Sequence, residues 1–97
     1  MSNWVQFRIR SKWLNANLQL VILLALSRRP MSKWELLDEI YGRFGLAPDE
    51  AELKRTTQLL INGGFVQVVS DESQSRMSVN ARGLELLSEL ERLLGVV

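Results

Sequence analysis

The sequence predicts a mainly α-helical domain with a small β-hairpin, in the order strand, helix, helix, helix, strand, strand, helix. Three observations lead to this fold class. Several stretches place apolar residues at helical spacing between capping residues, prolines and glycines. Two short runs rich in β-branched residues flank a polar segment late in the chain. The length of 97 residues fits a single domain, 1–97, with a modest core.

The first predicted element is a basic strand. Residues 4–10, WVQFRIR, alternate apolar residues with polar ones that include Arg8 and Arg10, which is typical of a half-buried strand. We therefore expect residues 1–14 to form a basic N-terminal strand or arm. Its basic residues lie near tryptophans, which suits phosphate contact and base stacking. Alternatively, the tryptophans cover the core and the strand pairs with its copy in a second subunit.

A helix is predicted next, from about residue 15 or 17 to residue 29. Between residues 20 and 26 it is apolar nearly all round, so we expect it to be buried on more than one side. Pro30 ends this helix.

The second predicted helix begins at SKWE, residues 32–35. Ser32 and Glu35 have the spacing of a capping box, in which each side chain bonds the other residue's backbone amide. Gly45 is a natural stop. Four residues share helical spacing and predict one buried stripe: Leu37, Ile40, Tyr41 and Phe44.

The third predicted helix covers residues 49–62. Asp49 and Glu52 have the spacing of a second capping box. The glycine pair 63–64 is expected to supply a left-handed cap at the end of the helix.

A hairpin and a last helix complete the chain. FVQVV (65–69) and RMSV (76–79) are predicted strands joined by the polar tip SDESQS, so that the hairpin covers residues 65–79. Asn80 is expected to cap the last helix, residues 81–94. This order of elements is that of a winged helix-turn-helix domain, in which the hairpin is the wing.

The stretch ILLALSRRPMSKWELLDEI resembles the start of PadR-like winged helix transcriptional regulators. The resemblance covers about residues 18–94 and implies a winged helix fold and a DNA-binding regulator. The residues that carry it are Pro30, Met31, Trp34, Glu35 and Leu36, then Leu60, Gly64, Phe65 and Val66, and finally Asn80 and Gly83. The chain departs from the family pattern in having Lys33 where a glycine is usual, and two acids beside a single arginine, Arg76, in the wing. These departures concern the DNA contacts and leave the predicted fold unchanged.

Composition excludes several classes of function. The chain has no cysteine and no histidine, so disulfides, thiolate metal sites and the usual general base are unavailable. No glycine-rich phosphate loop or nucleophile arrangement appears, and we expect neither catalysis nor a cofactor or metal. The apolar run at residues 20–26 is far shorter than the ~20 residues that span a bilayer. No secretory leader is recognisable, so we expect a cytoplasmic protein.

The charge is unevenly distributed along the chain. Residues 1–33 hold six basic residues and no acid, whereas the rest holds six basic residues and all eleven acids. Such asymmetry is a hint of a polyanionic partner, here double-stranded DNA. Alternatively, Arg28 and Arg29 only stabilise the C-terminal dipole of their helix.

The third helix is the predicted DNA-reading element. If Leu53, Thr56 or Thr57, and Leu60 face the core, the outward face holds Glu50, Lys54, Arg55, Gln58 and Asn62. Lysine and arginine pair with guanine or phosphate, and glutamine with adenine. The residues that we predict to contact DNA are Ser32, Lys33, Lys54, Arg55, Gln58, Arg76, Arg8 and Arg10.

Three acids at the start of this helix, Asp49, Glu50 and Glu52, oppose that prediction because they would meet a polyanion. They also have a local explanation, since acids in a first turn complement the helix dipole and cap free amides. Glu50 has, in addition, the favourable spacing for an ion pair with Lys54. The alternative is a solvated helix face with ordinary ion pairs.

The first and last helices carry more leucine than one domain needs. We therefore expect a homodimer in which two third helices meet adjacent half-sites. The predicted interface residues are Leu20, Leu24, Leu87, Leu90 and Leu94. The leading hypothesis is a dimeric, sequence-specific DNA-binding regulator of transcription. The alternative is a winged helix module for protein–protein interaction that does not bind DNA through its third helix.

Overall fold

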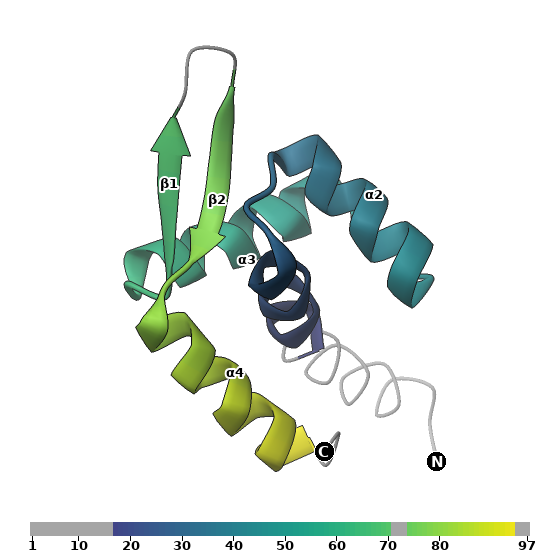
Figure 1. Cartoon of the computed structure of the whole chain (residues 1–97). Coiled ribbons are helices and arrows are strands. Elements are labelled where there is room, and N and C mark those ends of the chain that lie inside the picture. The colour runs from purple at the N-terminus through teal and green to yellow at the C-terminus, as the bar shows by residue number, and fades with distance from the viewer. Residues whose placement is uncertain (1–16, 71–73, 95–97) are drawn as a thin grey trace, which may run out of the picture.

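The computed structural model describes residues 17–70 and 74–94 of the chain. It shows a central helix over residues 17–28, then three further helices and a two-stranded hairpin (Figure 1). The elements after the central helix are α2 (Lys33–Phe44), α3 (Glu50–Asn62), β1 (Val66–Ser70), β2 (Ser75–Val79) and α4 (Ala81–Leu94). The predicted order from the first helix onward is confirmed. The predicted N-terminal strand, with the arm over residues 1–14, lies outside the described residues.

The core surrounds the central helix. Ile22, Leu23 and Ala25 are fully buried, which explains why this helix has almost no polar face. The residues of other elements that are buried to the same degree include Met31, Leu36, Ile40, Leu53 and Leu60. Helical periodicity therefore identified the buried central helix and three further core residues, Ile40, Leu53 and Leu60, but it did not identify Leu36.

The predicted buried stripe of α2 is confirmed at Ile40, only in part at Leu37 and Phe44, and is wrong at Tyr41. Leu36 and Ile40 are the buried residues of this helix, and Leu37 and Phe44 are half-buried. Tyr41 is 68% exposed. The core-facing line runs through Leu36 and Ile40, so Tyr41 is rotated out towards solvent although it lies one turn after Leu37.

The two strands form an antiparallel hairpin with Val66 opposite Val79 and Ser70 opposite Ser75. Met31 adds a short bridge to this sheet, because its amide donates to the Met77 carbonyl at 3.0 Å and its carbonyl accepts from the Met77 amide at 2.7 Å. The segment between the central helix and α2 is thereby fixed to the base of the wing.

The helices end at the predicted capping residues, and the structure differs from the prediction in two details of α3. Ser32 and Glu35 form the complete capping box, and Gly45 ends α2 in the left-handed conformation with φ of 68°. Asp49 caps α3 by accepting from the Glu52 amide at 2.8 Å, which is one half of the predicted box. The left-handed residue after α3 is Gly64, with φ of 79°.

Asn80 joins the start of α4 to the end of α3. Its side chain accepts from the Gly83 amide at 2.9 Å and donates to the Gly64 carbonyl at 2.8 Å. A Cβ at Gly83 would collide with the Phe65 carbonyl oxygen, so only glycine permits this approach. From this junction α4 runs away from the wing (Figure 1).

Candidate nucleic-acid interface

The outer face of α3 consists of four exposed polar residues, Lys54, Arg55, Gln58 and Asn62. The opposite side of the helix is buried at Leu53, Thr57 and Leu60. The predicted orientation of α3 is therefore confirmed. Thr57, not Thr56, is the buried threonine, and its hydroxyl is satisfied by donation to the Leu53 carbonyl at 2.9 Å.

Lys54 and Arg55 form no ion pair with any residue in the described part of the chain. Gln58 donates to the Asn62 side chain at 2.9 Å along the helix. The outer face thus presents an amide and two cations that have no carboxylate partner in residues 17–70 and 74–94, and such groups bind phosphate and base edges.

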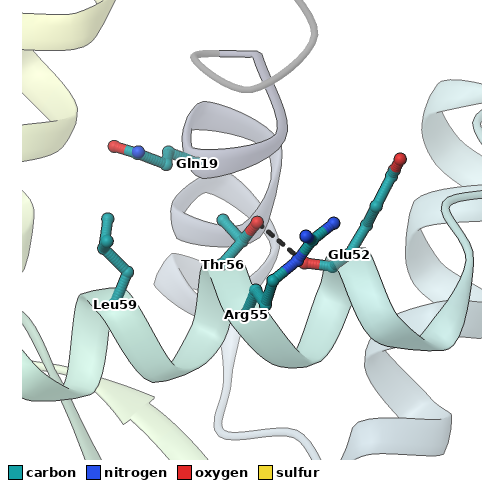
Figure 2. A pocket seen from close by; sticks show the side chains of 5 residues that line it. All are labelled: Gln19, Glu52, Arg55, Thr56 and Leu59. Atoms are coloured by element: carbon teal, nitrogen blue, oxygen red, sulfur yellow. Dashed lines mark hydrogen bonds between the residues drawn. The ribbon is translucent and has the colours of Figure 1, made fainter. Parts of the chain in front are cut away.

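Beside the outer face is an open depression of about 320 Å³ between α3 and the central helix. Figure 2 shows Arg55 there with Glu52, Thr56 and Leu59 on one side of α3, and Gln19 on the central helix. Thr56 donates to the Glu52 carbonyl at 2.8 Å. Arg55 therefore lies where the outer face meets this depression.

The acidic residues at the start of α3 have different partners. Asp49 is the helix cap. We predicted that Glu50 pairs with Lys54, but it pairs instead with Lys33 of α2 at 3.0 Å. The correction follows from the fold, because the first turns of α2 and α3 lie close enough for a pair between helices. Lys54 is left without a carboxylate partner within the described residues.

At the start of α2, only one of the two predicted phosphate contacts reaches the surface. Ser32 is 6% exposed, and its hydroxyl accepts from the Glu35 amide in the capping box. Lys33 is exposed, and its ammonium lies 4.9 Å from the Trp34 ring centroid as well as against Glu50. The expectation that Ser32 holds phosphate is corrected by its burial.

Where the segment after the central helix meets β2, six residues form a cluster that we name the wing base: Arg29, Met31, Ser32, Glu35, Arg76 and Met77. Glu35 is its centre, since its carboxylate accepts from Arg29 at 2.7 Å, from Arg76 at 3.4 Å and from the Ser32 amide at 3.1 Å. These bonds, above all the one from Arg29, lower the pKa of Glu35 from 4.5 to about 2. The sequence indicated the capping role of Glu35 but not its arginine partners.

The predicted dimer residues fall into three groups. Leu20 and Leu87 are 3% and 8% exposed in a single copy, so they belong to the core and the prediction of an interface role is corrected. Leu24 and Leu90 are half-buried. The side chain of Leu94, like Arg8 and Arg10 of the DNA prediction, lies outside what the structure describes.

Within residues 17–70 and 74–94, no helix combines the length and the apolar character needed to cross a membrane. The sequence matches no protein-family model and no curated protein.

The structure is similar to solved structures of winged helix proteins. A transcriptional regulator from Clostridium thermocellum superposes with a TM-score of 0.81 at 12% identity, over 88% of this chain and 89% of that chain. A PadR-like transcription factor from Bacteroides fragilis gives 0.73 at 18% identity, over 91% and 89%. F93 from STIV, described as a winged-helix DNA-binding protein, gives 0.69 at 17% identity, over 80% and 85%.

These similarities establish the winged helix fold of the chain. The PadR-like factor among them agrees with the resemblance found in the sequence. The first of the three proteins is named a transcriptional regulator, the second a transcription factor and the third a DNA-binding protein.

Proposed function

We propose that the chain is a sequence-specific DNA-binding protein that regulates transcription as a homodimer. The observation that carries the proposal is the outer face of α3, where Lys54, Arg55 and Gln58 are exposed while the opposite side of the helix is buried in the core. Winged helix domains with this arrangement lay the corresponding helix in the major groove.

Each residue of the proposed interface has a chemical role. Lys54 and Arg55 bind guanine edges or phosphate, and Gln58 pairs with adenine after exchanging its bond to Asn62. Lys33 and Arg76 bind phosphate on either side of the groove, which makes the hairpin a wing on the DNA backbone. Arg8 and Arg10 are proposed as further backbone contacts from the N-terminal arm.

The proposed dimer uses α4 and the central helix. Leu84 and Leu93 on α4 are 46% and 73% exposed, and Leu90 is half-buried. Leu90 and Leu93 are three positions apart and so lie on the same side of α4, and an exposed apolar surface of this kind is typical of an interface between copies. Leu24 and Leu94 complete the predicted contact. Light scattering should give twice the mass of one chain, and Leu93→Glu should convert the protein to monomers.

A fluorescence titration with duplex DNA at several salt concentrations tests the function. We expect binding that weakens steeply with salt, because neutralised phosphates release counterions. The double change Lys54→Ala, Arg55→Ala should lower the affinity at least about tenfold. The control is Arg43→Ala, Arg92→Ala, which removes the same charge from residues already paired with Glu39 and Glu89. No binding at low salt would refute the proposal, and unaltered affinity of the double variant would move the contact to Arg8 and Arg10.

A second candidate function is protein–protein interaction. Trp34 and Tyr41 are 64% and 68% exposed on α2, and aromatic residues are enriched in protein interfaces. The acidic start of α3 would then face a basic partner. This function is favoured if duplex DNA fails to bind at low salt and Trp34 fluorescence responds to a basic protein.

A further inference from the structure

Two arginines from distant parts of the sequence share one carboxylate in the wing base. Arg29 follows the central helix, Arg76 lies on β2, and Glu35 is in the first turn of α2. The Arg29 Nη1 to Glu35 Oε2 distance is 2.7 Å, and the Arg76 Nε to Glu35 Oε1 distance is 3.4 Å. Two guanidinium groups therefore share the Glu35 carboxylate.

The position of the Glu35 carboxylate is one that suits any oxyanion. Oε1 also accepts from the Ser32 amide at 3.1 Å, at the N-terminus of α2, where the helix dipole favours negative charge. Guanidinium groups bind carboxylate and phosphate oxygens with the same planar geometry. Glu35 thus occupies a place where a phosphate group would find the same donors.

The ion pairs are accessible enough to exchange. The exposed fractions of the side chains are 55% for Arg29, 37% for Arg76 and 30% for Glu35. Exposed ion pairs contribute little net free energy, because solvent screens them. Lys33, two residues from Glu35 in the same first turn, pairs with Glu50 at the start of α3, so the cluster adjoins the proposed DNA interface.

We propose that Arg29 and Arg76 form a binding site for a DNA backbone phosphate, and that Glu35 fills this site in the free protein as an internal substitute for the phosphate. The inference rests on the proposed function and adds to it a contact, Arg29, and an internal competitor, Glu35. Binding then exchanges the carboxylate for a phosphate, so the carboxylate lowers affinity for every duplex, whatever its sequence.

The test measures the affinity of Glu35→Gln for a fluorescein-labelled duplex of mixed sequence over a series of salt concentrations. Glutamine at this position keeps the capping box, because its amide oxygen accepts from the Ser32 amide. We expect the affinity at low salt to rise roughly two- to tenfold. The slope of log K against log salt should become steeper by about 0.9 for each additional phosphate neutralised.

The matched control is Glu89→Gln, which removes the same charge from a carboxylate that also binds an arginine, Arg92 at 2.7 Å on α4. It should change neither affinity nor slope by a comparable amount. In a background of Arg29→Ala and Arg76→Ala, the gain from Glu35→Gln should disappear. An equal gain from both glutamine variants, or a loss of affinity in Glu35→Gln, would overturn the inference.

A second variant keeps the inference testable if Glu35→Gln is poorly folded. Arg29→Ala should weaken DNA binding and flatten its salt dependence. Arg28→Ala removes a neighbouring exposed arginine that is paired with Glu39, and it should have a smaller effect on both quantities. Equal effects of the two would overturn the inference. Wild-type protein that binds no duplex at low salt would instead refute the proposed function, on which the inference depends.

Discussion

The outer face of α3 and the wing base both carry basic residues, but these residues are ion-paired only in the wing base. Lys54 and Arg55 have no ion-pair partner among residues 17–70 and 74–94, whereas Arg29 and Arg76 of the wing base lie 2.7 and 3.4 Å from the Glu35 carboxylate. Among the residues that the structure describes, the side chains of the outer face make no hydrogen bond to another element, while the wing base joins α2, β2 and the segment that follows the central helix. This difference teaches that the outer face of α3 can be altered with little effect on folding, whereas the charged residues of the wing base also contribute to folding.

The largest expected effect is on the free energy of unfolding and compares the wing base with the outer face of α3. Met31 of the wing base is 1% exposed. Met31→Ala should lower the free energy of unfolding by about 2–5 kcal/mol, because it leaves a cavity at the wing base. Gln58→Ala on the outer face should stay within about 0.5 kcal/mol. Urea unfolding measures both, and Met31→Leu, expected to cost less than about 1.5 kcal/mol, is the volume control. Equal losses at the two sites would contradict this difference.

The next effect concerns sequence preference. Gln58→Ala should lose about 1–3 kcal/mol of discrimination at one base pair, because the bidentate amide is removed. Affinity for random duplex should change little, since no charge is lost. Competition between a selected duplex and its single-base variants measures the preference. A uniform loss over all duplexes would place Gln58 on the backbone instead.

A smaller effect on stability is expected from removing the N-terminal caps of α2 and α3. Ser32→Ala should destabilise the protein by about 1–2 kcal/mol, because a buried, reciprocal capping box is broken. Asp49→Ala, at an exposed cap with one bond, should cost about 0.5–1 kcal/mol. Thermal unfolding of the two variants should show this order. The reverse order would mean that the start of α3 contributes more to folding than the wing base.

The smallest effect is a pH dependence of the wing base. The pKa of Glu35 in the folded protein is lowered to about 2, so its contribution to stability is complete above its ordinary value of 4.5 and is lost as the pH falls towards 2. The difference in unfolding midpoint between wild type and Glu35→Gln should therefore shrink across this window. Glu89→Gln is the control, and a difference that is independent of pH would contradict the role of the carboxylate charge.

Local patterns predicted the helices and the orientation of α3 because their information lies within a few residues. Apolar spacing identified Leu53 and Leu60 as buried, and Asn80 was recognisable as a cap from sequence. The same approach misplaced Tyr41, since several apolar residues of α2 satisfy helical spacing and only packing selects among them. The outer face of α3, as the proposed reading surface, was thus predictable.

The wing base was not predictable, because its contacts join residues distant in sequence. Arg76 and Glu35 are separated by 41 positions, and the bridge between Met31 and Met77 depends on the hairpin's final position. The partner of Glu50 was expected within its own helix, at Lys54, but the approach of α2 supplies Lys33. Leu20 and Leu87 looked like surplus leucines because the sequence does not show how much surface the central helix buries.

The asparagine that begins α4 has a geometric consequence for an assembly of two copies. Asn80 holds the Gly64 carbonyl and the Gly83 amide at 2.8 and 2.9 Å, so the direction of α4 is locked to the end of α3. In a homodimer joined through α4, this one side chain sets the span and the mutual angle of the two α3 helices. Asn80 would then determine the spacing between the two half-sites of a palindromic target without contacting DNA itself.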